Sequence, residues 1–411
     1  MKNKTILVLS DSIFLTTGFS SQCLFLFNRL SELGYSIHLR AASYVGQELP
    51  KGCVKLQDGT PVNFSLYGRG RDDYCKDVII PRIQQIKPDI FFVLLDTFML
   101  FNWYEHQDFS PAKTIFWAPS DGGGGLPHGC EKVLQKCYYP VMMSKFGQKQ
   151  MKDIHNLQTD YIPHMVDYEL FKPATKEEKE QLKIKYSLQG KYVVGLIGRN
   201  QGRKMHDRAI KAFAKWCKPH QEAVLLIHYD PYDSAAVFDT IKLVQFLGIA
   251  NRVVFTGMKY YQTFPYKQLP EIYNLMDVYM SSTSGEGFGV TTIEAESCEI
   301  PVLVTDYTTT SELITNHNSG EGIKLVGTEQ VNVFDLHSKE YDLMMMNGTI
   351  TGSWTVERGL MDINDCAEKL EKLYQNPELR KQYGKNGRIA VLKEYTCDIV
   401  VEKWNKVLQS L

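Results

Sequence analysis

The segment VYMSSTSGEGFGVTTIEAESCEIPVLVTD (278–306) contains a short apolar run, a glycine-rich loop, a helical stretch and a second apolar run. Gly285, Gly287 and Gly289 allow the loop to turn at low steric cost, so that its N–H groups can face a ligand. The helix that begins near Val290 points its positive end into the same space, which suits a phosphate or a polar sugar. This order of elements predicts a βαβ unit with a ligand site where the first strand ends.

Short apolar runs alternate with longer amphipathic stretches on both sides of this segment. Strands are predicted at residues 5–10, 36–42, 89–96, 114–119, 192–199, 223–229, 252–257, 278–282 and 301–306. Helices are predicted at residues 18–33, 205–216 and 397–408, among others. Strands separated by helix-length segments form parallel sheets, and the second half of the chain repeats the plan of the first. The expected fold class is therefore α/β, with two Rossmann-like domains.

A highly charged stretch, PATKEEKEQLKIKYSLQGK (173–191), separates the two halves. Its charge predicts a solvated helix, and its position marks the boundary between the domains. We expect an N-terminal domain of residues 1–168 plus 396–411 and a C-terminal domain of residues 169–395. Because open parallel sheets bind ligands at the carboxyl ends of their strands, we expect the two domains to face each other across a cleft.

The composition of the 411 residues excludes several classes of function. Lys and Arg number 46 and Asp and Glu number 47, and a net charge of −1 argues against a nucleic-acid binder. The nine cysteines are scattered and form no C-x-x-C pair, which favours reduced thiols in a cytoplasmic protein over disulfides or zinc sites. The longest apolar run, 90–100, is broken by Asp96 and is shorter than the roughly 20 residues that span a bilayer.

Charged side chains follow two of the predicted strands. In GLIGRNQGRKMHDRAIKAF (195–213), three cations, Arg199, Arg203 and Lys204, precede a helix. Arg supplies a planar fork and Lys a point charge, and together they suit a diphosphate. A solvated basic helix start is the alternative reading, but cations are unfavourable at a helix N-terminus.

Two carboxylates in the glycine-rich segment can act on one ligand, since Glu286 lies in the loop and Glu294 two helical turns beyond it. A carboxylate accepts two hydrogen bonds, which suits the hydroxyls of a sugar. The alternative reading is structural, with a glutamate near the helix N-terminus that interacts favourably with the helix dipole.

Three motifs, YIPHMVDYELFKP (161–173), GLIGRNQGRK (195–204) and GEGFGVTTIEA (285–295), resemble in order and spacing those of glycosyltransferase family 4. That retaining family has the GT-B fold, and the resemblance covers the chain from Gly18 to the terminal helix. It implies an N-terminal acceptor-side domain and a C-terminal domain that binds a nucleotide-diphosphate sugar. A weaker resemblance is to the glycosyltransferases of large DNA viruses of algae, which would place the protein in the cytoplasm of a host.

The resemblance implies roles for individual residues. Glu286 and Glu294 match the Glu-x7-Glu pair of the family, and Arg199 and Lys204 match its diphosphate-binding Arg and Lys. Catalytic roles are expected for Glu286, Arg199, Lys204 and Asp121. Donor-binding roles are expected for Gly18, Arg199, Lys204, Met258, Lys259, Tyr260, Gly287, Phe288, Gly289, Val290 and Glu294. Residues 258–261 correspond to the region near the nucleobase.

The chain departs from the family pattern at three places. Many members carry a sugar-contacting His after the strand at 114–119, where this chain has Ser-Asp-Gly. Asp121 is therefore the candidate for that role, with Asp96 as a second acid. The first-loop glycine pair is reduced to Gly18, and Glu299-Ile300 stands where members often have Gly.

The expected reaction is the metal-independent transfer of a hexose with retention. No D-x-D motif occurs, and Arg199 and Lys204 would stabilise the leaving diphosphate in the place of a metal. No cofactor is expected beyond the co-substrate. The Gly-Arg-Asn loop (198–200) and the segment IPHMVD (162–167) look most like those of mannosyltransferases in the family, which favours GDP-mannose over UDP-glucose. The acceptor would be a glycan, a protein-linked glycan or a lipid, and neither it nor the oligomeric state is encoded in a readable motif.

Other functions are compatible with parts of the pattern. A GT-B-fold sugar-nucleotide epimerase is disfavoured by the Glu-x7-Glu spacing, and a phosphorylase by the lack of a Lys in a pyridoxal-phosphate context. A non-catalytic sugar-nucleotide sensor is disfavoured because the charged residues of both motifs are retained. The apolar stretch 98–103 could touch a membrane surface, although packing in the core or the acceptor cleft is favoured.

Overall fold

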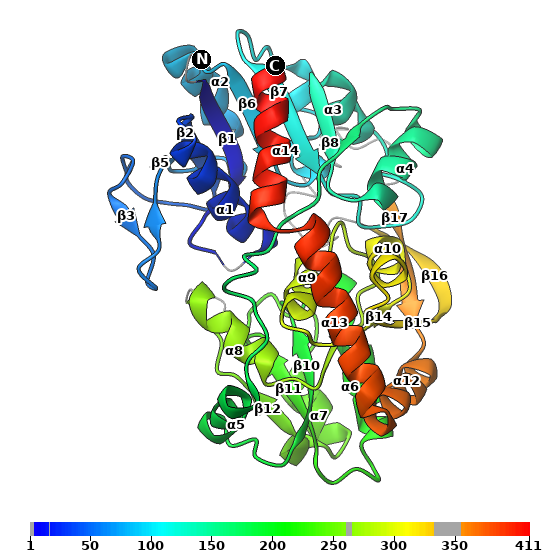
Figure 1. Ribbon diagram of the computed structural model, residues 1–411. Coiled ribbons are helices and arrows are strands. Elements are labelled where there is room, and N and C mark those ends of the chain that lie inside the picture. The colour runs from blue at the N-terminus through cyan, green and yellow to red at the C-terminus, as the bar shows by residue number, and fades with distance from the viewer. Residues whose placement is uncertain (1–3, 16, 260–264, 333–354) are drawn as a thin grey trace. The chain divides into compact units, whose positions relative to one another are not determined.

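The fold is seen in a computed structural model of the chain (Figure 1). The structure describes residues 4–15, 17–259, 265–332 and 355–411. These residues divide into two compact units. Unit 1 comprises Met1–His164, Gln330–Glu357 and Cys397–Leu411, and unit 2 comprises Met165–Glu329 and Arg358–Thr396. Each unit is built around one parallel sheet, so the predicted α/β class with two Rossmann-like domains is confirmed.

The sheet of unit 1 has seven strands in the order β5-β2-β1-β6-β7-β8-β9, and all its pairings are parallel. Its strands are β1 (Thr5–Asp11), β2 (Ser36–Ala42), β5 (Ser65–Tyr67), β6 (Ile90–Leu94), β7 (Lys113–Ala118), β8 (Tyr139–Met142) and β9 (Asp160–Tyr161). A small antiparallel pair consists of β3 (Val54–Lys55) and β4 (Pro61–Val62). The four strands predicted from apolar runs in this half are present, with ends that differ by at most two residues.

Helices of unit 1 cover this sheet. They are α1 (Gly18–Glu32), α2 (Lys76–Ile86), α3 (Glu131–Lys136), α4 (Lys145–His155) and α14 (Cys397–Ser410), with the 3₁₀ turns η1 (Thr97–Leu100) and η2 (Tyr104–His106). The terminal helix α14 lies beside α1 in Figure 1. Its Trp404 is fully buried, with ring centroids 4.8 Å from Phe92 and 5.2 Å from Trp117. The last helix is thus held in unit 1 by aromatic packing.

The sheet of unit 2 has six parallel strands in the order β12-β11-β10-β13-β14-β15. They are β10 (Tyr192–Ile197), β11 (Ala223–His228), β12 (Val253–Phe255), β13 (Val278–Ser281), β14 (Val302–Thr305) and β15 (Gly320–Ile323). From β10 the chain first builds outward to β11 and β12 and then returns to add β13 on the other side. The strand order therefore reverses between β10 and β13, and such reversals are where doubly wound sheets bind ligands.

The helices of unit 2 are α5 (Lys176–Lys185), α6 (His206–Trp216), α7 (Thr240–Phe246), α8 (Leu269–Asn274), α9 (Val290–Ser297), α10 (Thr308–His317), α12 (Ile363–Gln375) and α13 (Pro377–Glu394). Short 3₁₀ turns are η3 (Gly202–Lys204), η4 (Ala250–Arg252) and η5 (Tyr266–Gln268). The charged linker forms α5 as predicted, and Thr175 and Glu178 make a capping box at its start. Outside both sheets, β16 (Leu325–Asn332) pairs with β17 (Thr355–Met361).

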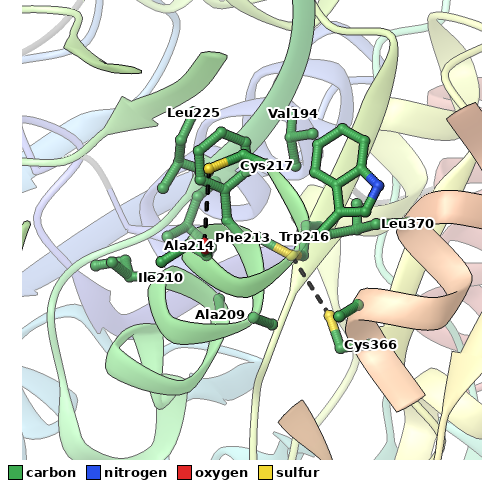
Figure 2. Close-up of a cluster of buried hydrophobic side chains, with 14 of the residues drawn as sticks. Val194, Ala209, Ile210, Phe213, Ala214, Trp216, Cys217, Leu225, Cys366 and Leu370 are labelled. Atoms are coloured by element: carbon green, nitrogen blue, oxygen red, sulfur yellow. Dashed lines mark hydrogen bonds between the residues drawn. The ribbon is translucent and has the colours of Figure 1, made fainter. Parts of the chain in front are cut away.

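The core of unit 2 explains why α6 forms where the sequence predicts it. Ile210, Phe213 and Trp216 recur at helical spacing and belong to one buried cluster with Val194 and Leu225 of the sheet (Figure 2). Leu370 and Cys366 of α12 close the same cluster. Burial of this apolar face holds α6 in the core of unit 2.

Three further expectations can be compared with the structure. No two of the nine cysteines, all of which lie in the described ranges, form a disulfide. The apolar stretch 98–103 packs, partly buried, against the core of unit 1, as the favoured reading predicts. Among the described residues, no helix is both long enough and apolar enough to cross a bilayer.

Candidate functional site

The candidate site is formed by two loops of unit 2 that leave neighbouring strands at the reversal of the sheet. The η3 turn follows β10, and the glycine-rich loop follows β13. The backbone oxygen of Arg203 accepts hydrogen bonds from the backbone N–H and the hydroxyl of Ser284, at 2.7 and 2.9 Å. The hydroxyl of Ser282 donates to the backbone oxygens of Lys204 and Met205, at 2.8 and 2.9 Å. These hydrogen bonds hold the two loops against each other, so that their side chains lie in one site.

Glu286 is the carboxylate that pairs with two cations of this site. Its Oε2 accepts a hydrogen bond of 2.9 Å from a guanidinium nitrogen of Arg203, and its Oε1 is paired with Lys204 Nζ. Only 7% of Glu286 is exposed. Burial opposes ionisation of this carboxyl, but the charges of Arg203 and Lys204 outweigh it and lower the pKa of Glu286 to about 2. The group is therefore an anion at any physiological pH.

The loop around Glu286 is fixed by hydroxyl groups from α10. The backbone N–H of Glu286 donates to Thr308 Oγ1 at 3.0 Å, and Thr309 Oγ1 donates to the backbone oxygen of Gly287 at 3.2 Å. Phe288 is buried against Tyr395, with ring centroids 5.7 Å apart. Of the three loop glycines, only Gly289 has a positive φ, +96°, and it is the N-cap residue of α9. The need for glycine is therefore clearest at Gly289, where the backbone is left-handed.

Glu294, in the second turn of α9, has a different environment. Its two carboxyl oxygens accept hydrogen bonds from two tyrosine hydroxyls, Tyr273 at 2.6 Å and Tyr266 at 3.0 Å. Burial raises the pKa of Glu294 to about 7, although both hydrogen bonds act against the rise. Glu286 and Glu294 both act electrostatically on buried Tyr279 of β13, whose pKa is raised chiefly by burial. Tyr279 is thus a residue on which both carboxyls of the Glu-x7-Glu motif act.

Arg199 is held by an acid that the sequence analysis did not single out. Its Nε and one terminal nitrogen donate to the two carboxyl oxygens of Asp233, at 2.5 and 3.1 Å. This fork geometry is the strong form of an Arg–carboxylate pair. The hydrogen bond from Arg199 lowers the pKa of Asp233, against a smaller opposing effect of burial. Arg203, which the sequence grouped with the other cations, is the arginine that pairs with Glu286 beside Lys204.

The remaining predicted residues are placed as follows. Val290 begins α9, and Met258 and Lys259 follow β12, where Lys259 Nζ lies 5.7 Å from the ring centroid of Tyr232. Tyr260 lies outside the described residues. Gly18 and Asp121 belong to unit 1, where Gly18 begins α1 and Asp121 follows β7. Donor contacts by any of these residues stay predictions.

Comparison with known proteins adds an independent line of evidence. Residues 177–328 match the family model described as Glycosyl transferases group 1. The mannosylfructose-phosphate synthase of Agrobacterium fabrum is 27% identical over 170 residues, which are 40% of this chain and 35% of that protein. A GDP-mannose-dependent alpha-mannosyltransferase of Mycobacterium tuberculosis is 31% identical over 155 residues, 38% of this chain and 35% of that protein. The chain thus spans about a third of the length of these curated relatives.

The structural comparison covers the whole chain. A glycosyltransferase from Rickettsia africae, solved by crystallography, superposes with a TM-score of 0.71 at 16% identity, over 100% of this chain and 99% of that one. At this identity the similarity establishes the fold alone. The chain therefore has the GT-B fold, and its residues 177–328 match the model of the Glycosyl transferases group 1 family.

Proposed function

We propose that the chain transfers a hexosyl residue from a nucleotide-diphosphate sugar to an acceptor, with retention of configuration and without a metal ion. The observation that carries this proposal is the pairing of Glu286 with Arg203 and Lys204 at the strand end beside the start of α9. Cations at this place would stabilise a leaving diphosphate, and the adjacent carboxylate would bind sugar hydroxyls. Such a set of groups matches the charge distribution of a sugar diphosphate.

Each group has a proposed part in the reaction. As the bond between the sugar and the phosphate breaks, negative charge grows on the diphosphate, and Lys204 with the arginines of its loop would stabilise that charge. Glu286 would hold hydroxyls of the donor sugar, and Glu294 would accept hydrogen bonds from the ribose. The leaving phosphate would take the proton of the acceptor hydroxyl, so that the acceptor attacks the same face that the phosphate leaves. Gly18 and Asp121 of unit 1 are proposed to contact the donor.

For the donor, we favour GDP-mannose over a UDP-glucose type. Sequence relatives whose names specify mannose support this choice, among them the Mycobacterium tuberculosis enzyme described above. The acceptor is proposed to be a glycan, a protein-linked glycan or a lipid.

The proposal is tested by incubating the protein with GDP-mannose, UDP-glucose and UDP-N-acetylglucosamine, each with a panel of glycan and lipid acceptors and with EDTA present. The expected result is release of nucleoside diphosphate that depends on the acceptor and is fastest with GDP-mannose. The anomeric configuration of the product, read by NMR, is expected to match that of the donor. Near-normal rates in Lys204→Ala and Glu286→Gln would contradict the site assignment, and a complete loss of transfer in EDTA would contradict metal independence.

A further inference from the structure

Unit 2 buries a network of four polar side chains that the proposed reaction does not use. They are Glu296, His317, Ser319 and Tyr395, and each is at most 7% exposed. Nδ1 of His317 lies 2.9 Å from both carboxyl oxygens of Glu296, and the hydroxyl of Ser319 donates to one of these oxygens at 2.5 Å. Nε2 of His317 lies 3.2 Å from the hydroxyl of Tyr395. The network thus joins α9 and α10 to the residue that ends α13.

This network can form whether His317 is charged or neutral. A carboxylate only accepts hydrogen bonds, so the proton on the Glu296 side is carried by Nδ1. A hydroxyl both donates and accepts, so Tyr395 can accept from a protonated Nε2 or donate to a bare one. Burial lowers the pKa of His317, but the charge and hydrogen bond of Glu296, with the charges of Glu394 and Glu312, outweigh burial and raise it. In either charge state the three helices stay linked.

Tyr395 is the member of the network that contacts the glycine-rich loop. The centroid of its ring lies 5.3 Å from that of His317 and 5.7 Å from that of Phe288. Its main chain is held as well, because its N–H donates to the backbone oxygen of Val391 and its own oxygen accepts from the N–H of Val166, both at 2.9 Å. Ring and main chain of Tyr395 are therefore fixed where Phe288 packs against it.

Phe288 holds a part of the loop that has little steric restraint of its own. It lies between Gly287 and Gly289, and glycines leave the backbone more freedom than any other residue. Only 3% of Phe288 is exposed, so its ring anchors the backbone on both sides. A loop that is ordered before a ligand arrives binds more tightly, because less free energy is spent on ordering it.

We propose that Tyr395 is a positioning residue of the donor site, an inference that rests on the proposed function. Held by His317 and Glu296, the ring of Tyr395 fixes Phe288, and Phe288 fixes the adjacent backbone N–H groups that would bind the donor. Tyr395 acts through Phe288 and needs no contact with the donor itself. Loss of the network should therefore raise KM for the donor and leave KM for the acceptor unchanged.

The experiment centres on Tyr395→Phe, which keeps the ring and removes the hydroxyl. Titration calorimetry measures GDP and UDP binding, transfer rates give KM for donor and acceptor, and hydrogen–deuterium exchange follows the amides of residues 285–289 without ligand. Since one hydrogen bond changes an equilibrium constant by roughly 2- to 10-fold, we expect donor KM and the Kd of the nucleoside diphosphate to rise about 3-fold, with faster loop exchange. His317→Asn keeps a donor toward Glu296 and removes Nε2. It should have the same effect, and the double variant should be no worse than either single one, because both changes break one bond.

Two further variants test the path from Tyr395 to the loop. In a Phe288→Ala background, Tyr395→Phe should no longer change donor binding. Tyr383→Phe is the matched control, since it removes from α13 a hydroxyl that donates to Glu321 at 2.7 Å, and it should leave donor KM and loop exchange unchanged.

Equal effects of Tyr395→Phe and Tyr383→Phe, or an effect of Tyr395→Phe that persists in Phe288→Ala, would overturn the inference. So would unchanged loop exchange in Tyr395→Phe when the wild type binds GDP or UDP, and the proposed function would then stand. Should His317→Asn fail to fold, the Tyr395 and Phe288 variants still decide the outcome. A wild-type protein that binds no nucleoside diphosphate and no sugar nucleotide would overturn the proposed function, and this inference with it.

Discussion

The loop at Glu286 and the second turn of α9 at Glu294 lie eight residues apart and bury the same chemical group. Burial alone raises the pKa of a carboxyl, because it disfavours the charged form. At Glu286 two cations reverse this effect and lower the pKa to about 2. At Glu294 two tyrosine hydroxyls only reduce the effect of burial, so the pKa is still raised to about 7. Burial is common to both glutamates, and the partners that tertiary structure brings in decide whether its effect on the pKa is reversed, as at Glu286, or only reduced, as at Glu294.

The comparison predicts different tasks for the two groups. Glu286 is a permanent anion whose charge is balanced by neighbours that also suit a diphosphate. Glu294 is within reach of protonation near neutral pH and already accepts two hydrogen bonds. A ribose hydroxyl at Glu294 would therefore bind best above pH 7, when the carboxyl is ionised. Three sets of variants test this contrast between Glu286 and Glu294.

Removal of the Lys204 side chain should have the largest effect. Lys204→Ala deletes a cation from the proposed leaving-group site and leaves Glu286 with Arg203 as its cationic partner among the groups described above. Loss of one such electrostatic contact typically lowers kcat by about 10²–10³-fold. Steady-state transfer rates measure it, with Lys211→Ala as a control, because Lys211 pairs with Asp207 on the outside of α6. Equal rates in the two variants would show that the Glu286 region is not the reaction centre.

The fold was predictable because its signals are local. Apolar runs such as 223–229 and 301–306 indicate buried parallel strands, whichever residues pack against them in the folded protein. The strand β15 (Gly320–Ile323) was not predicted, since the letters GEGI offer one large apolar side chain and no alternation. The strand exists because Val302–Thr305 provides a hydrogen-bonding edge, which is a tertiary cause. Gly320 is required there because a side chain at this position would collide with the backbone of Val302.

The candidate site was predictable only in part. The motifs identify the loops of Lys204 and Glu286, and the structure brings these loops into contact. The partners Asp233 and Tyr273 were missed because they lie in elements distant in sequence, β11–α7 and α8, where neither has a local pattern that marks it. Arg203 was grouped with Arg199 and Lys204 as a diphosphate-binding cation, but its pairing with Glu286 was not predicted, because sequence cannot tell which of two arginines in a loop faces a given carboxylate. The functional roles of all these residues stay predictions.

The second experiment follows stability against pH, where the two glutamates should have opposite effects. The folded pKa of Glu286 is lowered from 4.5, so its contribution is present above pH 4.5 and is lost as the pH falls toward 2. The folded pKa of Glu294 is raised from 4.5, so its contribution is present below pH 4.5 and is lost as the pH rises through 7. A shift of this size corresponds to about 3 kcal/mol in each case.

Urea unfolding at pH 3.5, 5 and 8 measures this contrast in the wild type and the two Gln variants. Between pH 5 and 8, the wild type should lose stability relative to Glu294→Gln. Between pH 5 and 3.5, it should lose stability relative to Glu286→Gln. If the stabilities of the two variants change with pH in the same way, both carboxyls have ordinary environments. The contrast between the pKa values of Glu286 and Glu294 would then be wrong.

The smallest effect is expected from Tyr273→Phe, which removes one hydroxyl and keeps the buried ring. The hydroxyl of Tyr273 donates to Glu294 at 2.6 Å and so favours the ionised carboxylate. Its loss should raise the pKa of Glu294 further and cost about 1 kcal/mol of stability at pH 8. The deficit should shrink below pH 6, where the carboxyl is protonated in the wild type as well. Tyr279→Phe is the matched control, because the hydroxyl of Tyr279 donates to Thr291 and its loss should give a deficit that does not change across pH 7. If the two tyrosine variants have the same pH profile, Tyr273 packs beside Glu294 without controlling its charge, and the raised pKa is then set by burial alone.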